Sequence, residues 1–245
     1  MTMNLMLGDC LERMKEIPDG SVDMILADPP YGTTACKWDS VIDLPSMWEQ
    51  LKRIIKPNGA IVMTASQPFT TILASSNMGQ FRYEWIWQKS NSTGFQLAKK
   101  MPMKKHENIL VFYKKIPTYN PQGLIAYGKR NRRSKAGNGG HLANECNDYI
   151  QEFTNYPTQL IHFGYDSNKL HPTQKPVALM EYLIKTYTDK GDLILDNCAG
   201  SGTTGVASKA SGRNFVGCEI SPKYYQLAVD NIEKVVDLFN ENNEH

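Results

Sequence analysis

The feature that most constrains the fold is a largely apolar segment, residues 22–27, that stops at two consecutive prolines. Its sequence, VDMILA, is typical of a strand buried on both faces of a parallel sheet. Asp28 follows directly, and neither Pro29 nor Pro30 can extend a hydrogen-bonded ladder. Each proline also forces the residue before it into an extended conformation. The sequence therefore predicts an α/β fold in which a stiff acidic turn ends a central strand.

The tetrapeptide Asp28-Pro29-Pro30-Tyr31 would present a carboxylate, a rigid carbonyl and an aromatic ring where ligands bind in open α/β sheets. An exocyclic amine of a nucleobase is a weak nucleophile, because its lone pair is delocalised into the ring. The Asp28 carboxylate and the Pro29 carbonyl could accept its two hydrogens, and so localise and aim that lone pair. Tyr31 could stack on a base turned out of a duplex. An ordinary strand-ending turn is the alternative, but the whole tetrapeptide after an apolar strand favours a catalytic site.

A glycine-rich turn forms the second constellation. It lies between a predicted strand, residues 192–196, and a predicted helix, residues 203–210, and residues 200–205 read GSGTTG. Glycines let a backbone approach a ligand, and a helix N-terminus offers amides to an anion. Glu219 stands at the end of the next predicted strand, where an acid can hold ribose hydroxyls. The pattern indicates a nucleotide-type cofactor and suits a dinucleotide equally well, while a tight turn without a ligand is the plainer alternative.

Basic residues are concentrated in one part of the chain. Of the 27 Lys and Arg residues, 13 lie between Arg82 and Lys135, a stretch that contains only two acids and several interspersed aromatic residues. This distribution favours a nucleic-acid-binding surface over a solvated charged face. The basic residues expected to contact DNA phosphates or to act in recognition are Lys89, Lys99, Lys100, Lys104, Lys105, Lys129, Arg130, Arg132 and Arg133.

Length and composition bound the remaining possibilities. A chain of 245 residues fits one large α/β domain with an inserted segment. We expect residues 1–115 and 171–245 to be its two halves, and residues 116–170, which show no clear periodicity, to be an inserted recognition segment. Residues 32–43, with Trp38, are expected to form a loop over the site, and residues 89–107 a loop that could touch phosphates. A buried strand is expected over residues 60–64, after a turn at residues 57–59. Five scattered cysteines predict reduced thiols in a cytoplasmic protein without a metal site, and no apolar run predicts a membrane span.

At this point the motifs resemble a known family. Asp28-Pro29-Pro30-Tyr31 combined with a later AGSGTT, residues 199–204, resembles the DNA amino-methyltransferases that use S-adenosylmethionine. The order, with the catalytic motif first and the glycine motif last, is similar to their circularly permuted β group. The sequences HENILVF, residues 106–112, and HPTQKP, residues 171–176, also resemble motifs of that group. The similarity extends from Gly8 to Glu219 and leaves only residues 116–170 uncovered.

The resemblance implies a Rossmann-like seven-stranded sheet with helices on both faces and S-adenosylmethionine as cofactor. Asp9 would meet the cofactor's adenine amine, Glu219 its ribose and Lys175 its methionine part. Asn197-Cys198 stands where the family usually has Pro-Phe, so an aromatic wall of the pocket is absent or supplied elsewhere. The cofactor-binding residues implied in this way are Asp9, Cys10, Lys175, Asp196, Ala199, Gly200, Ser201, Gly202, Thr203, Thr204 and Glu219.

The implied activity is direct methyl transfer, without a covalent intermediate, to the exocyclic amine of a flipped base in double-stranded DNA. An aspartate in the first place of the tetrapeptide favours adenine N6, with cytosine N4 as the alternative. A homodimer and a companion restriction endonuclease are compatible with this interpretation. Three rivals stay open: an NAD-type oxidoreductase, which leaves the diproline motif without a role, a methyltransferase acting on RNA or on a protein amide, and a DNA-binding module that has lost catalysis.

Overall fold

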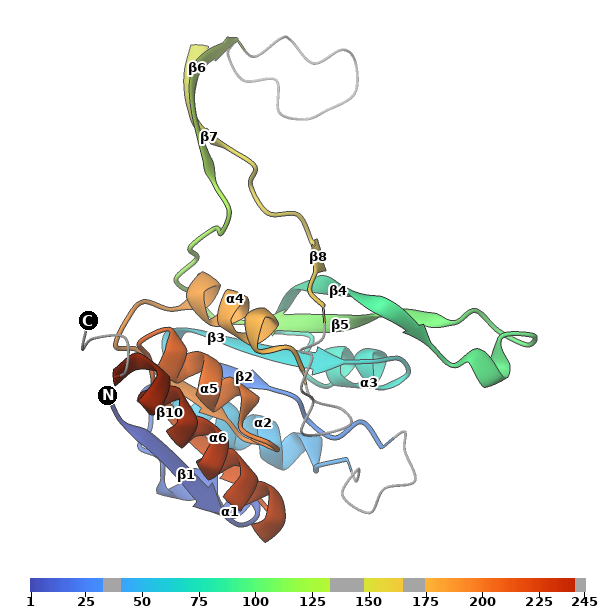
Figure 1. The fold of residues 1–245 in the computed structure, drawn as a ribbon, viewed down its shortest axis with the longest axis vertical. Coiled ribbons are helices and arrows are strands. Elements are labelled where there is room, and N and C mark those ends of the chain that lie inside the picture. Colours follow the sequence, from blue (N-terminus) through green and yellow to red (C-terminus); the bar gives the residue numbers. More distant parts are fainter. Residues whose placement is uncertain (33–40, 133–147, 165–174, 241–245) are drawn as a thin grey trace. The chain divides into compact units, whose positions relative to one another are not determined.

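A computed structural model describes residues 1–32, 41–132, 148–164 and 175–240 (Figure 1). Most of the predicted loop over the site, including Trp38, lies outside these residues, as does Arg133. The chain divides into two compact units. The larger comprises Met1–Asn120 and Gln159–His245, and the smaller comprises Pro121–Thr158. The larger unit therefore contains both the diproline motif and the glycine-rich turn.

An eight-stranded sheet forms the centre of the larger unit, in the order β1-β10-β9-β2-β3-β5-β4-β8. Neighbouring strands from β1 to β3 in this order are parallel, while β5 is antiparallel to β3 and to β4. The strand expected first, residues 22–27, is β2, the fourth in this order. The short β8 adds an edge strand beside β4 to the seven strands that the resemblance implied. The bounds are β1 Met3–Leu7, β2 Val22–Ala27, β3 Ile55–Ala65, β4 Phe81–Thr93, β5 Lys104–Phe112, β8 Leu160–His162, β9 Leu193–Asp196 and β10 Asn214–Glu219.

Helices cover both faces of this sheet, as expected, because its inner strands are apolar on both sides (Figure 1). On β3, Ala60 and Val62 pack against one group of helices, while Ile61 and Met63 pack against the other. Among the described helices, none has both the length and the apolar character needed to cross a bilayer. The first group is α4 Val177–Tyr187, α5 Thr203–Ala210 and α6 Pro222–Asn240, and the second is α1 Cys10–Arg13, the 3-10 helix Met14–Glu16, α2 Leu44–Ile54 and α3 Phe69–Ser76.

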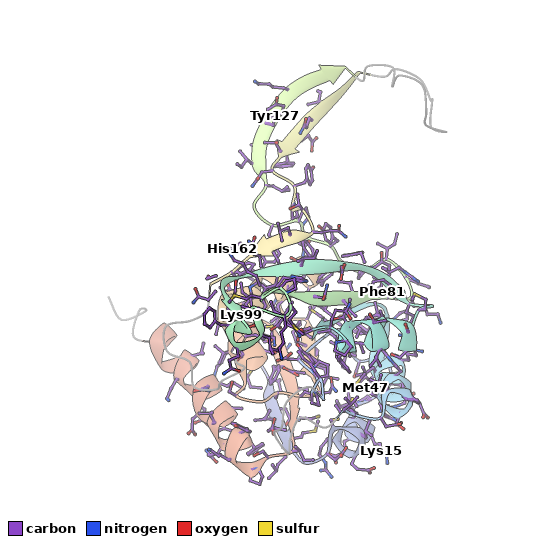
Figure 2. All side chains as sticks on the ribbon, turned by 90° about the vertical axis from the view of Figure 1, so that its right-hand side faces the viewer. Lys15, Met47, Phe81, Lys99, Tyr127 and His162 are labelled. Carbon is purple, nitrogen blue, oxygen red and sulfur yellow. The ribbon has the colours of Figure 1, made fainter. Side chains whose placement is uncertain are left out.

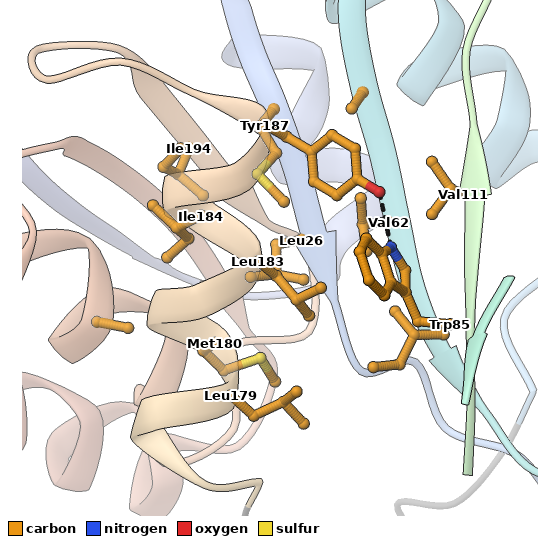
Figure 3. Packing of buried hydrophobic residues seen from close by; sticks show 14 of the residues in the cluster. Leu26, Val62, Trp85, Val111, Leu179, Met180, Leu183, Ile184, Tyr187 and Ile194 are labelled. Atoms are coloured by element: carbon orange, nitrogen blue, oxygen red, sulfur yellow. Dashed lines mark hydrogen bonds between the residues drawn. The ribbon is translucent and has the colours of Figure 1, made fainter. Parts of the chain in front are cut away.

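Helix α4 anchors one side of the core. Figure 3 shows Leu183 and Tyr187 directed from α4 towards Leu26 of β2, Val62 of β3 and Trp85 of β4. The indole Nε1 of Trp85 donates a hydrogen bond to the hydroxyl of Tyr187 at 2.7 Å, so the polar tip of this buried ring is satisfied. This packing fixes the segment that precedes α4, which contributes to the site.

Two segments differ from the sequence-based prediction. The strand expected from residue 60 begins at Ile55, because Ile55 pairs with Val22 and the register then shifts so that Ala60 pairs with Met24. The predicted turn at residues 57–59 is therefore an irregularity within β3. Residues 89–107, expected to form a loop, instead extend β4 to Thr93 and start β5 at Lys104, and a 3-10 turn, Phe95–Leu97, closes this hairpin.

The smaller unit is a two-stranded antiparallel ribbon of β6, Ile125–Arg132, and β7, Asp148–Thr154. Its register shifts between Ala126 and Lys129, where Gly128 has φ +60°. Apolar side chains of both strands, including Ile125 and Ile150, are exposed. Because none of the side chains described on these two strands is buried, the sequence lacks the alternation that reveals a strand.

Candidate active site

The two motifs lie at the same edge of the sheet. β1, β10, β9 and β2 are neighbouring parallel strands, so their carboxyl ends meet. Asp28 follows β2, Asp196 ends the adjacent β9, and Glu219 ends β10, where it pairs with Leu7 of β1. Asp9 comes two residues after β1. The diproline turn and the acids predicted for the cofactor site are therefore brought together.

The carboxylate of Asp28 is held at both oxygens. The hydroxyl of Tyr31 donates to Oδ1 at 2.7 Å, and the hydroxyl of Thr64 donates to the same oxygen. The ammonium of Lys175 lies 2.9 Å from Oδ2. The side chain is nevertheless 26% exposed. Asp28 is thus oriented by partners from β3 and from the segment before α4, and it still faces solvent.

Lys175 belongs to a buried chain of charges that sequence reasoning did not find. Its side chain is only 7% exposed, and Nζ lies 3.1 Å from Oε2 of Glu107 on β5. The other oxygen of Glu107 pairs with Lys89 on β4. Burial by itself would lower the pKa of Lys175, but Asp28, Tyr31 and Glu107 together raise it well above its usual value, so the lysine is a cation. Lys89, Glu107, Lys175 and Asp28 therefore alternate in sign, and we call them the ion-pair chain.

Tyr31 is fixed in place by its ring as well as by its hydroxyl. The ring stacks on Phe69 of α3, with the centroids 5.4 Å apart and the planes at 22°. Burial, followed by the negative charge of Asp28, raises the pKa of Tyr31 well above its usual value. The hydroxyl therefore stays protonated and acts as a donor to Asp28. The sequence predicted the place of Tyr31 but gave no signal for Phe69.

The glycine-rich turn lies between β9 and α5, as its sequence predicted. Gly200 and Gly202 have φ of +53° and +83°, in the left-handed region that favours glycine. A Cβ on Gly202 would lie 2.9 Å from Cα of Ala228, so the close approach of α6 also requires glycine there. The amide of Gly200 donates to Oε2 of Glu219 at 2.8 Å, and the amide of Ser221 donates to Oε1 at 2.7 Å. Both oxygens of Glu219 keep capacity for another donor.

Asp196 is the most buried acid at this edge. Burial raises its pKa to about 7, against the lowering effect of hydrogen bonds from Thr204 and from the amide of Cys198, which lies 2.9 Å from Oδ1. Asp196 thus changes its charge near neutral pH. The other residues predicted for this turn lie around it, at the start of α5 or just before: Ala199, Ser201, Thr203 and Thr204, all of them buried.

The residues present fit a cofactor that carries a ribose, an amine and a positive charge. Oδ1 of Asn197 is buried and has no hydrogen-bond partner among the described residues, so it can accept a hydrogen bond from a bound ligand. Asp9 caps α1, because its Oδ1 accepts a hydrogen bond from the amide of Leu11 at 2.8 Å. This cap uses only one of the two carboxylate oxygens of Asp9. Cys10 starts the same helix. In the described part of the chain, no group of three or more His, Cys, Asp or Glu is placed to hold a metal ion.

The predicted DNA-binding residues fall into different environments. Lys89 is buried in the ion-pair chain and lies over the ring of Trp87, unlike a surface lysine. Lys129 is exposed on β6, and the side chains of Arg130 and Arg132 lie outside the described part of the structure. The exposed lysines of the hairpin of β4 and β5 are Lys99, Lys100, Lys104 and Lys105. Figure 2 labels Lys99.

An open α/β sheet that carries an acidic diproline turn and a glycine-rich turn at the same edge fits an enzyme that uses a nucleotide-type cofactor. The chain belongs to the DNA methylase family with N6 or N4 amino specificity, whose family model matches residues 22–230. It is a DNA methyltransferase of that family.

Relatives of known name and structure agree with this family. The chain is 30% identical to the DNA adenine methyltransferase YhdJ of Escherichia coli (strain K12), covering 92% of this chain and 81% of that protein. It is 26% identical to the type II methyltransferase M.HpaI of Haemophilus parainfluenzae, covering 95% and 75%. The M1.HpyAVI–SAM complex matches with a TM-score of 0.65 at 25% identity, over 94% of this chain and 99% of that one. The cytosine-N4-specific PvuII DNA methyltransferase, at 17% identity, shares the fold with a TM-score of 0.70 over 98% and 92%.

Proposed function

We propose that this DNA methyltransferase transfers a methyl group from S-adenosylmethionine to N6 of an adenine within a specific double-stranded DNA sequence. The observation that carries the proposal is the position of Asp28, oriented at both oxygens and located at the sheet edge that also holds the glycine-rich turn. The similarity to an adenine methyltransferase and to a methyltransferase bound to SAM supports the choice of base and cofactor.

When bound, the cofactor supplies an electrophilic methyl group on a sulfonium. Asp9 would accept from its adenine amine, Glu219 from its ribose hydroxyls, and the negative charge of Asp196 would favour its positive charge. We place Lys175 differently from the sequence-based expectation, as a residue that positions Asp28, because its ammonium lies on that carboxylate.

The target amine would donate one hydrogen to Asp28 and the other to the carbonyl of Pro29. Held in this way, the amine nitrogen would present its lone pair to the methyl group that the cofactor supplies. The methylated nitrogen would then lose one proton, and the partly exposed carboxylate of Asp28 would accept it. Tyr31 would border the flipped base.

DNA phosphates would be contacted by Lys99, Lys100, Lys104 and Lys105 on the hairpin, and by Lys129 of the smaller unit with Arg130, Arg132 and Arg133. We leave Lys89 out of this set, because its ammonium is buried against Glu107. A homodimer and a companion restriction endonuclease stay predictions.

The test is transfer of labelled methyl groups to plasmid DNA, followed by mapping of the modified bases. Asp28→Asn should abolish transfer and leave the affinity for S-adenosylmethionine, measured by calorimetry, within about twofold. Asp230→Asn, an exposed acid of α6, is the matched control and should behave as the wild type. If the modified base is cytosine, the target is cytosine N4 and the proposal of adenine N6 is wrong. Normal turnover by Asp28→Asn would refute the role of Asp28.

A further inference from the structure

The hairpin of β4 and β5 continues beyond the catalytic edge of the sheet. Ala65, the last residue of β3, pairs with Asn108 of β5, so residues of β5 before Asn108 lie past the end of β3. There β4 and β5 pair with each other, as at Gln88 with His106 and at Thr93 with Lys104 (Figure 1). Glu107, which contacts Lys175 in the ion-pair chain, lies at the start of this projection. The base of the hairpin is therefore linked to Asp28 through Lys175.

The end of the hairpin exposes apolar side chains on an ordered turn. Phe95 is 79% exposed, and Leu97, Met101 and Met103 are also exposed. The turn is held by its own backbone, since the amide of Leu97 donates to Gly94 at 2.9 Å and that of Met101 to Leu97 at 3.0 Å. Gly94, with φ +88°, lets the chain enter the turn. We call residues 94–103 the hairpin tip.

The charge around the hairpin tip matches a polyanion. Lys99 and Lys100 lie within the tip and Lys104 and Lys105 follow it, and all four are exposed. No acidic residue occurs between Lys89 and Glu107 in the sequence. Apolar side chains flanked by lysines can enter a base step while the lysines hold the neighbouring phosphates. Phe95 also has an aromatic face on which a base can stack.

We propose that the hairpin tip is a wedge that enters the DNA duplex beside the target base, with Phe95 replacing the stacking that the flipped base loses. This inference rests on the proposed function, because a wedge is needed only if the target base leaves the duplex. It adds to that function a group that drives flipping, separate from the residues that hold the amine.

The test compares two DNA substrates that differ in how easily the target base flips. One has the target base paired, and the other has it opposite an abasic site, where little unpairing remains to be done. Phe95→Ala should slow methylation of the paired substrate by about tenfold and that of the abasic-site substrate by less than about twofold. With 2-aminopurine at the target position, the variant should also lose the fluorescence increase that flipping produces. Phe95→Trp keeps an aromatic side chain, so this variant should methylate the paired substrate at the wild-type rate and should show the wild-type fluorescence increase.

Controls separate the wedge from other effects. Ile116→Ala removes another strongly exposed apolar side chain, 81% exposed and outside the hairpin tip, and should match the wild type on both substrates. Lys99→Gln should weaken binding of both substrates equally and flatten the salt dependence, without selectivity for the paired target.

Equal loss on both substrates, or no loss, in Phe95→Ala would overturn the wedge. The wedge would also be overturned if Phe95→Ala left DNA methylation and 2-aminopurine fluorescence unchanged but reduced binding to vesicles of anionic lipid. That result would identify the tip as a membrane contact. Failure of the proposed function is distinct, because the wild type would then methylate neither DNA.

Discussion

Replacing Lys175 with methionine tests the ion-pair chain, because it removes the cation that lies 2.9 Å from Asp28 and 3.1 Å from Glu107. Removing one partner of a buried pair destabilises a protein by about 3–5 kcal/mol. Here Asp28 keeps the hydroxyl donors Tyr31 and Thr64 and is partly exposed, and Glu107 keeps its pair with Lys89. We therefore expect a loss of about 2–3 kcal/mol in the free energy of unfolding, or about 4–12 °C in Tm.

The loss should be measured by urea unfolding, alongside kcat for methyl transfer, which should fall at least about tenfold because Asp28 loses the group that orients its Oδ2. The raised pKa of Lys175 fixes the sign of the pH dependence. Its stabilising contribution is complete below about pH 10 and is lost only as the pH rises through the folded pKa, so the difference from wild type should stay constant from about pH 6 to 9.

Lys185→Met is the matched control, since Lys185 on α4 forms a partly exposed pair with Glu181, at side-chain exposures of 42% and 31%. It should change the free energy of unfolding by less than about 0.5 kcal/mol. If Lys175→Met changes the free energy of unfolding by no more than this control does and retains its kcat, our reasoning about Lys175 is wrong. The ion-pair chain would then neither stabilise the fold nor orient Asp28.

Two further predictions concern the cofactor edge. Asp196, whose pKa burial raises to about 7, should make the affinity for S-adenosylmethionine rise several-fold between about pH 6 and 8, and calorimetry of Asp196→Asn should show a flat profile. Because this folded pKa exceeds the usual 3.8, the stability that Asp196 contributes is complete below about pH 4 and declines as the pH rises through about 7. Gly202→Ala should cost about 2–4 kcal/mol in thermal unfolding, since φ is +83° and the new Cβ would meet Ala228 at 2.9 Å. Gly212→Ala, with φ +78° but only Lys190 nearby, at 3.8 Å, should cost about 1–2 kcal/mol, and equal losses would contradict the role assigned to the approach of α6.

The sequence predicted elements wherever one pattern dominated. β2 and α5 have the bounds expected of them, Val22–Ala27 and Thr203–Ala210. In the first case an apolar run ends at two prolines, and in the second a glycine turn precedes a helix that packs on one face. In both cases a breaker residue and a hydrophobic pattern mark the same boundary, so the two local signals agree.

The sequence could not predict groups that assemble only through the sheet. Thr64 lies on β3 and contacts Asp28, and Glu107 lies on β5 and contacts Lys175. Both contacts depend on strand order and register, which a sequence pattern does not encode. Lys89 was expected to contact DNA because a charge count cannot separate a buried paired lysine from an exposed one. The start of β3 at Ile55 was missed because Pro57 and Gly59 are ordinary turn residues. In the structure they lie within β3, where its pairing with β2 shifts register.

The order of the motifs along the chain has little influence on the site, because strand neighbours alone set its geometry. β9 lies beside β2, and the carboxylate of Asp23 on β2 accepts from the amide of Leu193 on β9 at 3.0 Å, across a sequence separation of 170 residues. The entropic cost of closing a loop grows only with the logarithm of its length. A chain that reaches Asp28 first and the glycine-rich turn last can therefore build the same edge as one in the opposite order. The pairing of β2 with β9, in contrast, is essential for the site, because it puts the Asp28 carboxylate beside the turn that ends at Gly202.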